Sequence, residues 1–151
     1  MKKYLFVTLS LFLCLFVFTG CEKVESGKYK EGTYFGYVED DYSKPSAIAT
    51  AVVYVNENGM IKSVFLDTTY TKDELLTSKK ALGSEYGMLK ASEVKKEWYE
   101  QVNLIEAKVI ENQDTSFITF NDEGKTDTIA GVTMKVDKLV EALNKALEQA
   151  K

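Results

Sequence analysis

The dipeptide Asn58-Gly59, which separates two apolar runs, constrains the fold of this chain more than any other feature. Asparagine and glycine tolerate the positive φ angles of a tight turn, so the pair is a strong hairpin signal. It predicts a β-hairpin with strands at about residues 49–55 and 60–66. We expect an earlier strand to begin at Thr33, and residues 40–45 to form a loop before the hairpin.

Two later segments carry apolar residues at helical spacing. The first follows Ser92, a candidate N-cap, and its apolar residues recur every three or four positions: Val94, Trp98, Val102, Ile105 and Val109. The second lies at the C-terminus and repeats the pattern: Val136, Leu139, Val140, Leu143 and Leu147. Between them we expect a strand at residues 115–120 and a turn at 121–124. The fold class is therefore α+β, with a small antiparallel sheet and hairpin packed against two or three helices.

The N-terminus has the pattern of an export signal. Lys2 and Lys3 precede an apolar run at residues 4–18, which is short for a membrane-spanning helix of about 20 residues. The following Phe18-Thr19-Gly20-Cys21 resembles the bacterial lipobox, in which the cysteine is acylated and becomes the new N-terminus. An uncleaved membrane anchor is the alternative interpretation.

The lipobox resemblance implies a division of the chain into three parts. Residues 1–20 are expected to be a lipoprotein signal peptide, and residues 21–31 a lipidated N-terminus with a flexible tether. Residues 32–151 form the folded domain. Two acyl chains on Cys21 suffice for stable anchoring, so the protein is expected on the extracytoplasmic side of the cell membrane.

Composition excludes several kinds of chemistry. The chain has no histidine and no arginine, so it builds neither a Ser-His-Asp triad nor a histidine metal site. Its two cysteines, Cys14 and Cys21, both lie at the expected signal and lipidation site, which leaves the domain without a thiol. Without Lys2 and Lys3, 17 lysines face 23 acidic residues, a formal charge of −6. This acidic balance argues against binding to nucleic acid, which requires neutralised phosphates.

The segment before the C-terminal helix gathers groups that bind anions. Gly131 permits a backbone conformation that other residues resist. Thr133 is expected to cap the helix or to lie in its first turn. Free N–H groups at such a helix end attract phosphate. A hydroxyl, an acid and a glycine turn would then lie beside a phosphate-binding helix terminus.

The same segment carries a family resemblance. Asp127-Thr128-Ile129-Ala130-Gly131-Val132-Thr133 resembles the flavinylation motif of FMN-binding domains, Asp-x-x-Ser/Ala/Thr-Gly-Ala-Thr/Ser, with Val132 in place of the usual alanine. The resemblance implies that Thr133 forms a phosphoester with FMN, that Asp127 assists the modification and that Gly131 makes the glycine turn.

Further residues extend the resemblance over most of the domain. Glu31-Gly32-Thr33-Tyr34-Phe35-Gly36 resembles the family's opening strand, and the hairpin and C-terminal helix occur in the family order. Tyr86-Gly87-Met88 and Lys96-Glu97-Trp98 resemble the lipoprotein branch of the family.

The resemblance implies an electron carrier rather than an enzyme. A threonine hydroxyl is a poor nucleophile without activation, so a separate Mg-dependent flavin transferase is expected to deliver FMN from FAD. The carrier would pass electrons from a membrane donor, such as a quinol-linked dehydrogenase, to an external acceptor. Tyr34, Tyr37, Tyr86 and Trp98 are candidates to cover the flavin ring, although the helical spacing of Trp98 favours the core.

Two other functions fit the sequence. The same fold could hold FMN or another small ligand without a covalent bond. It could also be a structural surface lipoprotein that carries no cofactor.

Overall fold

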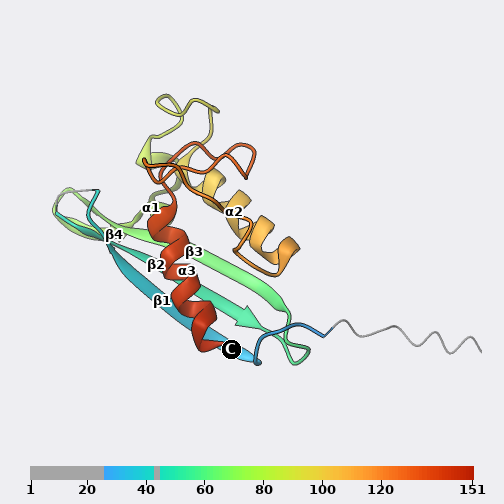
Figure 1. Cartoon of the computed structure of the whole chain (residues 1–151). Helices are drawn as coiled ribbons and strands as arrows, with labels where there is room; N and C mark the ends of the chain where they lie inside the picture. Colours follow the sequence, from blue (N-terminus) through green and yellow to red (C-terminus); the bar gives the residue numbers. More distant parts are fainter. Residues whose placement is uncertain (1–25, 43–44) are drawn as a thin grey trace, which may run out of the picture.

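The computed structural model describes residues 26–42 and 45–151. The predicted signal peptide, Cys21 and residues 22–25 lie outside this part of the chain. An antiparallel sheet in the order β1-β2-β3-β4 forms one layer, and the helices pack on one of its faces (Figure 1). The strands are β1 (Gly32–Asp40), β2 (Ala47–Val55), β3 (Ile61–Lys72) and β4 (Leu75–Ser78). The helices are α1 (Lys79–Leu82), the 3-10 helix η1 (Gly83–Tyr86), α2 (Trp98–Asn112) and α3 (Asp137–Gln149). The α+β class is confirmed.

The predicted hairpin connects β2 and β3. Gly59 has a φ of 75°, and its N–H donates to the Asn56 carbonyl at 2.9 Å. The Asn56 side-chain oxygen accepts from the N–H groups of Asn58 and Met60. A second turn, of two residues, joins β3 to β4 at Asp73-Glu74, and both residues have a positive φ angle. No residue there gives the usual Asn-Gly signal, and β4 was therefore not predicted.

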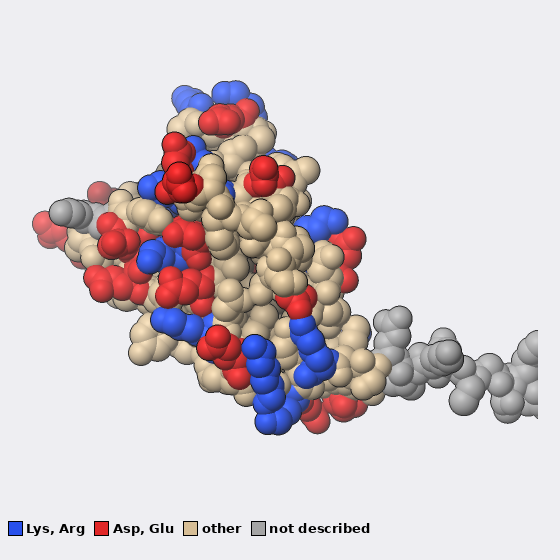
Figure 2. Space-filling model, viewed as in Figure 1, with Lys and Arg blue, Asp and Glu red and all other residues tan. Residues whose placement is uncertain are grey.

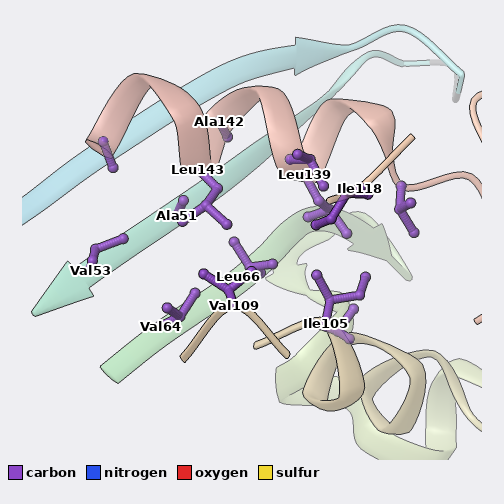
Figure 3. Packing of buried hydrophobic residues seen from close by; sticks show 14 of the residues in the cluster. Ala51, Val53, Val64, Leu66, Ile105, Val109, Ile118, Leu139, Ala142 and Leu143 are labelled. Carbon is purple, nitrogen blue, oxygen red and sulfur yellow. The ribbon is translucent and has the colours of Figure 1, made fainter. Parts of the chain in front are cut away.

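The core lies between the sheet and the two long helices (Figure 3). The inward residues of β2 are all alanine or valine: Ala47, Ala49, Ala51, Val53 and Val55. The predicted apolar positions of both long helices are buried except Val94, which precedes α2 and is half-buried, and Trp98 is only 4% exposed. The small side chains of β2 let α3 lie close to the strands. This close packing buries apolar area, which is the main stabilising contribution to the fold.

Helix side chains bond to free backbone groups of β1 and of the first part of β3, which β4 does not reach. On β1, the Gln149 amide donates to the Phe35 carbonyl at 2.7 Å. On β3, Gln113 accepts from the Ile61 N–H at 2.6 Å and donates to the Ile61 carbonyl at 2.9 Å. Glu106 accepts from the Leu66 N–H at 2.6 Å. Free backbone groups on edge strands invite pairing with other chains, and these side chains occupy them.

The middle helix begins later than predicted. Its N-cap is Glu97, which forms a capping box with Glu100, and not Ser92. Lys95 has a φ of 52°, which interrupts a helix that would continue from Ser92. The Ser92 hydroxyl instead accepts from the Lys96 N–H and the Gln101 amide.

Residues 115–120 do not form the predicted strand. The Asp114 carboxylate accepts from the N–H groups of Thr115 and Ser116, and the Ile118 N–H donates to the Thr115 carbonyl. These local bonds make turns in place of a ladder. On β1 and on the first part of β3, an additional strand would have to break the hydrogen bonds that helix side chains already make there.

The predicted tether is shorter than residues 21–31. Gly27 and Tyr29 donate backbone hydrogen bonds to Asn58 and Gly59, and Lys30 donates to Ala150 at 2.7 Å. Tyr29 is 8% exposed and belongs to the core. Burial of this tyrosine ring fixes the segment, so the folded domain begins before residue 32. Within the described residues, no helix is long and apolar enough to span a membrane.

Candidate functional site

A cavity of about 520 Å³ opens in the segment that connects α2 to α3. Six residues of the predicted motif line it: Asp127, Ile129, Ala130, Gly131, Val132 and Thr133. The remaining motif residue, Thr128, does not. The rest of the lining comes from Glu93, Thr119, Phe120, Asn121, Lys125 and Thr126. The motif thus forms one wall of a cavity whose other wall was not predicted.

A tight turn shapes the motif wall. The Val132 N–H donates to the Ile129 carbonyl at 3.2 Å, and Gly131 has a φ of 86°. A type II turn requires a positive φ at its third residue, which favours glycine there. A Cβ on Gly131 would also lie 3.0 Å from Leu104 Cδ1. The predicted glycine turn is confirmed, and its positive φ angle is what favours glycine at residue 131.

The buried members of the motif fix the loop to the core. Ile129 and Val132 are each 3% exposed and belong to the core cluster. Asp127 and Ala130 are exposed, and Thr133 is half-buried. This alternation anchors the loop on its inner side and leaves the acid and the hydroxyl-bearing residue on the cavity side.

Gln101 on α2 holds the backbone of Thr133. Its Oε1 accepts from the Thr133 N–H at 2.9 Å, and its Nε2 donates to the Ser92 hydroxyl at 3.1 Å. Gln101 is fully buried, so these bonds are protected from water. Among the described residues, no hydrogen bond engages the Thr133 hydroxyl.

The predicted role of Thr133 as a helix cap is wrong. Helix α3 begins at Asp137 with Val136 as its N-cap, four residues beyond Thr133. The N–H groups of Val136 and Asp137 donate to the Gly124 carbonyl, and neither residue lines the cavity. The predicted phosphate-binding helix end is therefore not part of this site, because the intervening residues 134–136 first return to the core.

A pair of threonine hydroxyls orders the start of the motif. The side chains of Thr126 and Thr128 lie 2.8 Å apart, and the Thr128 N–H donates to the Thr126 hydroxyl. Thr126 is 6% exposed, whereas Asp127 between them is exposed. The pair holds the chain in a bend that leaves the Asp127 carboxylate accessible.

The turn predicted at residues 121–124 is confirmed, and Asn121 and the flanking Phe120 and Lys125 belong to the part of the lining that was not predicted. The Asn121 side chain accepts from the N–H groups of Glu123 and Lys125 at 3.0 Å, and Gly124 has a φ of 73°. Phe120, 41% exposed, adds an aromatic ring to the lining. A hydrogen bond from Lys125 to Glu123 raises the pKa of the lysine, so it stays charged at this wall.

None of the four aromatic residues proposed to cover a flavin lines this cavity. The Tyr34 hydroxyl donates to Lys30 and Glu31 carbonyls, and Tyr37 lies on the open face of the sheet. Tyr86 and Trp98 pack edge to face, with ring centroids 6.4 Å apart. The aromatic residue at the cavity is Phe120, whose only sequence signal is a large apolar residue directly before a polar turn.

Metal ligands do not cluster in the part of the chain that the structure describes: it has no group of three or more histidine, cysteine, aspartate or glutamate side chains that could hold an ion.

Fold and site together define a class of protein: an α+β domain with a four-stranded antiparallel meander and a threonine-bearing loop cavity. The chain is 32% identical to a Clostridium thermocellum protein solved by solution NMR as a structural genomics target. The match covers 80% of this chain and 91% of the clostridial one, with a TM-score of 0.55. At this identity and coverage, the chain belongs to the same family as the clostridial protein. No family model and no curated protein matches the chain.

Proposed function

We propose that this domain carries FMN as a phosphoester on Thr133. One observation carries the proposal: Thr133 and Asp127 line the same cavity, and no described residue engages the Thr133 hydroxyl. A hydroxyl without an internal partner, on a backbone fixed by a buried glutamine, is a suitable acceptor for a transferred group.

The residues at the cavity fit such a cofactor. Its volume of about 520 Å³ falls within the range of roughly 300–1,000 Å³ usual for small-molecule sites. Phe120 offers a ring for stacking, and Lys125 a positive charge near phosphate or the flavin edge. Asn121 adds a polar group. When bound, FMN supplies electron transfer, and the protein supplies position and electrostatics.

Attachment requires a second protein. Thr133 Oγ forms a bond to the FMN phosphorus of FAD as the phosphoanhydride P–O bond breaks, AMP leaves, and the hydroxyl proton passes to a base. The chain has no histidine to act as this base, so a Mg-dependent flavin transferase performs the step. Exposed Asp127 is placed to enter that enzyme's active site together with Thr133.

The loaded domain then acts as a membrane-anchored electron carrier and not as an enzyme. Lipid on Cys21 holds it on the extracytoplasmic side of the cell membrane. A quinol-linked membrane dehydrogenase is the class of donor, and an external compound or protein is the acceptor. A covalent bond retains the cofactor where free FMN is dilute.

The test is co-expression of the full chain with a Mg-dependent flavin transferase. We expect a yellow protein that keeps its flavin through denaturation, with the flavin mass on the peptide that contains Thr133. Thr133→Ser retains the hydroxyl and should be flavinylated, whereas Thr133→Ala should not.

Thr119→Ala is the matched control, since Thr119 also lines the cavity and should be dispensable for attachment. If the colour is lost on denaturation, FMN is bound without a covalent bond, and the phosphoester proposal is wrong. A colourless wild-type chain made beside an active transferase would overturn the proposal and favour a surface lipoprotein without cofactor.

A further inference from the structure

The sheet face opposite the helices carries an exposed apolar surface. Helices α2 and α3 pack on one side, so every second side chain of β1 to β3 points away from them. We call the following six residues the aromatic face: Phe35, Tyr37, Ile48, Val52, Tyr54 and Phe65. Five of them are 36–60% exposed, and Val52 is half-buried.

Strand register makes this surface continuous. Phe35 lies opposite Val52, and Val52 lies opposite Phe65, so one apolar row crosses three strands. Tyr37 is two residues from Phe35 on β1, and Tyr54 is two residues from Val52 on β2, on the same side of the sheet. Single exposed apolar residues are ordinary, but a contiguous patch of this kind marks an interaction site.

None of the six residues of the aromatic face is charged. Glu39 lies at its margin, opposite Ile48 on β2. Asp67 lies two residues from Phe65 on β3 and opposite Thr50, but it is only 7% exposed, and its Oδ1 accepts from the Lys80 N–H. The Lys80 ammonium lies 4.4 Å from the Phe65 ring centroid but pairs with Glu106 at 2.5 Å. By contrast, the side that carries α3 is crowded with charges (Figure 2). The neutral surface can therefore meet an identical surface without like-charge repulsion.

The sheet edges offer little backbone to a partner strand. Gln149 bonds to the β1 edge at Phe35, and Gln113 and Glu106 bond to the unpaired first part of β3. Strand addition at these positions would break hydrogen bonds already formed. The remaining edge strand, β4, has only four residues. Face-to-face packing, as between two sheets at about 10 Å separation, therefore offers a partner the larger surface.

We propose that the aromatic face docks a second copy of this chain in a two-fold symmetric dimer. A large aromatic side chain presents about 150–250 Å² when fully exposed. At 43–60% exposure, the four aromatic residues of one copy therefore offer about 400 Å². Two copies, with Ile48, Val52 and the margins added, approach the lower limit of about 1,200 Å² for specific interfaces. The dimer is accordingly reversible and concentration-dependent.

The lack of charge on the aromatic face favours a second copy of the chain over a lipid surface as its partner. Docking on anionic membrane is driven by lysine and arginine clusters, and the aromatic face has none. The chain itself carries a net charge of −4, which disfavours anionic lipid further. A two-fold contact needs only a self-complementary surface, and a neutral apolar one satisfies this.

The dimer leaves the cavity accessible. None of the residues that line it belongs to a strand. Dimerisation and cofactor attachment are therefore independent, and the proposal does not rest on FMN.

The test uses cross-linking of the full chain in membranes of its host with a short bis-maleimide. Val52→Cys lies at the centre of the proposed contact, and Ala107→Cys lies at an exposed position on α2. We expect a homodimer band from Val52→Cys at about tenfold or more the yield from Ala107→Cys, because proximity raises the effective concentration. The chain without an added cysteine is the control for cross-links that form through Cys14 or Cys21.

A second substitution checks the cause. Phe35→Lys in the Val52→Cys chain should lower the dimer yield about tenfold, whereas Leu76→Lys, at a 77% exposed position on β4, should leave it unchanged. Unchanged thermal midpoints of the purified variants would confirm that both fold. Three results would overturn the proposal. They are equal dimer yields from Val52→Cys and Ala107→Cys, the absence of a dimer although the reagent labels the Val52→Cys thiol, and cross-links to another protein alone.

Discussion

At the scale of single residues, Gln101 links the candidate site to the core. It joins Thr133 to Ser92 from a fully buried position. Gln101→Leu keeps the approximate size but leaves the Thr133 N–H without an acceptor. Loss of a partner from a buried polar group costs about 1–3 kcal/mol. We expect this loss in the free energy of unfolding, measured by chemical denaturation, together with slower flavinylation of Thr133.

The control for this prediction is Asn103→Leu, at an exposed position on the same helix, which should change stability by no more than about 0.5 kcal/mol. If Gln101→Leu behaves like this control in both measurements, the glutamine does not position the loop.

Acid stability provides a second prediction at this scale. A hydrogen bond from Lys28, followed by backbone donors at Ser116 and Thr115, lowers the pKa of Asp114 to about 2. A lowered pKa in the folded state stabilises the protein above the pKa of the unfolded chain, near 3.8, and this contribution is lost as the pH falls towards about 2. Because both side chains are partly exposed, we expect a contribution of about 1 kcal/mol or less.

Asp114→Asn removes the titrating group and retains an oxygen for the backbone donors. Wild type should exceed this variant in unfolding free energy at pH 5, and the difference should shrink towards zero by pH 2. A difference that is constant over this range would show that the pair with Lys28 contributes nothing through ionisation.

At the scale of elements, β1 and α3 approach each other closely at Gly36. A Cβ added to Gly36 would lie 2.0 Å from the Ala142 carbonyl oxygen and 2.7 Å from the Ala146 backbone nitrogen. Both atoms belong to helix backbone, so they cannot move as a side chain does. We expect Gly36→Ala to destabilise the domain by about 1–3 kcal/mol or more, the usual cost of overpacking.

Thermal or chemical unfolding measures this effect, and Thr33→Ala, exposed on the same strand, is the control. A stability of Gly36→Ala equal to that of the control would mean that α3 lies further from the sheet than the structure has it.

Local signals explain which elements the sequence predicts. The hairpin at Asn58-Gly59 and the apolar spacing of both long helices depend on nearby residues, and all three were predicted. The start of α2 was not, because the positive φ of Lys95 has no sequence signal. Residues 115–120 have strand-like composition, but the availability of a sheet edge is a tertiary property that composition does not encode.

The candidate site also has a part that local sequence predicts and a part that it does not. Its motif wall was predicted from the residues, and the glycine turn is confirmed by the φ of Gly131. Its other wall, with Phe120 and Lys125, comes from a different turn that folding brings alongside. The contact between Gln101 and Thr133 joins residues 32 positions apart, and no periodicity or motif relates them.

At the scale of the whole molecule, the beginning of the described chain and the loop of the candidate site lie at opposite ends of α3. The Lys30 N–H donates to the Ala150 carbonyl beyond the end of α3, whereas Thr133 precedes the first residue of this helix by four positions. The helix has 13 residues, which places these points about 20 Å apart along its axis. The proposed anchor at Cys21 and the proposed flavin site should therefore be separable in function.

Replacing residues 1–21 with a secretory signal that is cleaved without acylation tests this separation. We expect the product to leave the membrane fraction yet to keep the wild-type ratio of flavin to protein when a transferase is co-expressed. Its reduction by the membrane donor should slow, because the donor and the carrier no longer share one surface. Fractionation, visible absorbance and quinol-dependent reduction measure the three properties. Normal reduction of the released protein by the membrane donor would show that the anchor is not needed. A loss of flavin would mean that attachment at Thr133 depends on the distant end of the chain.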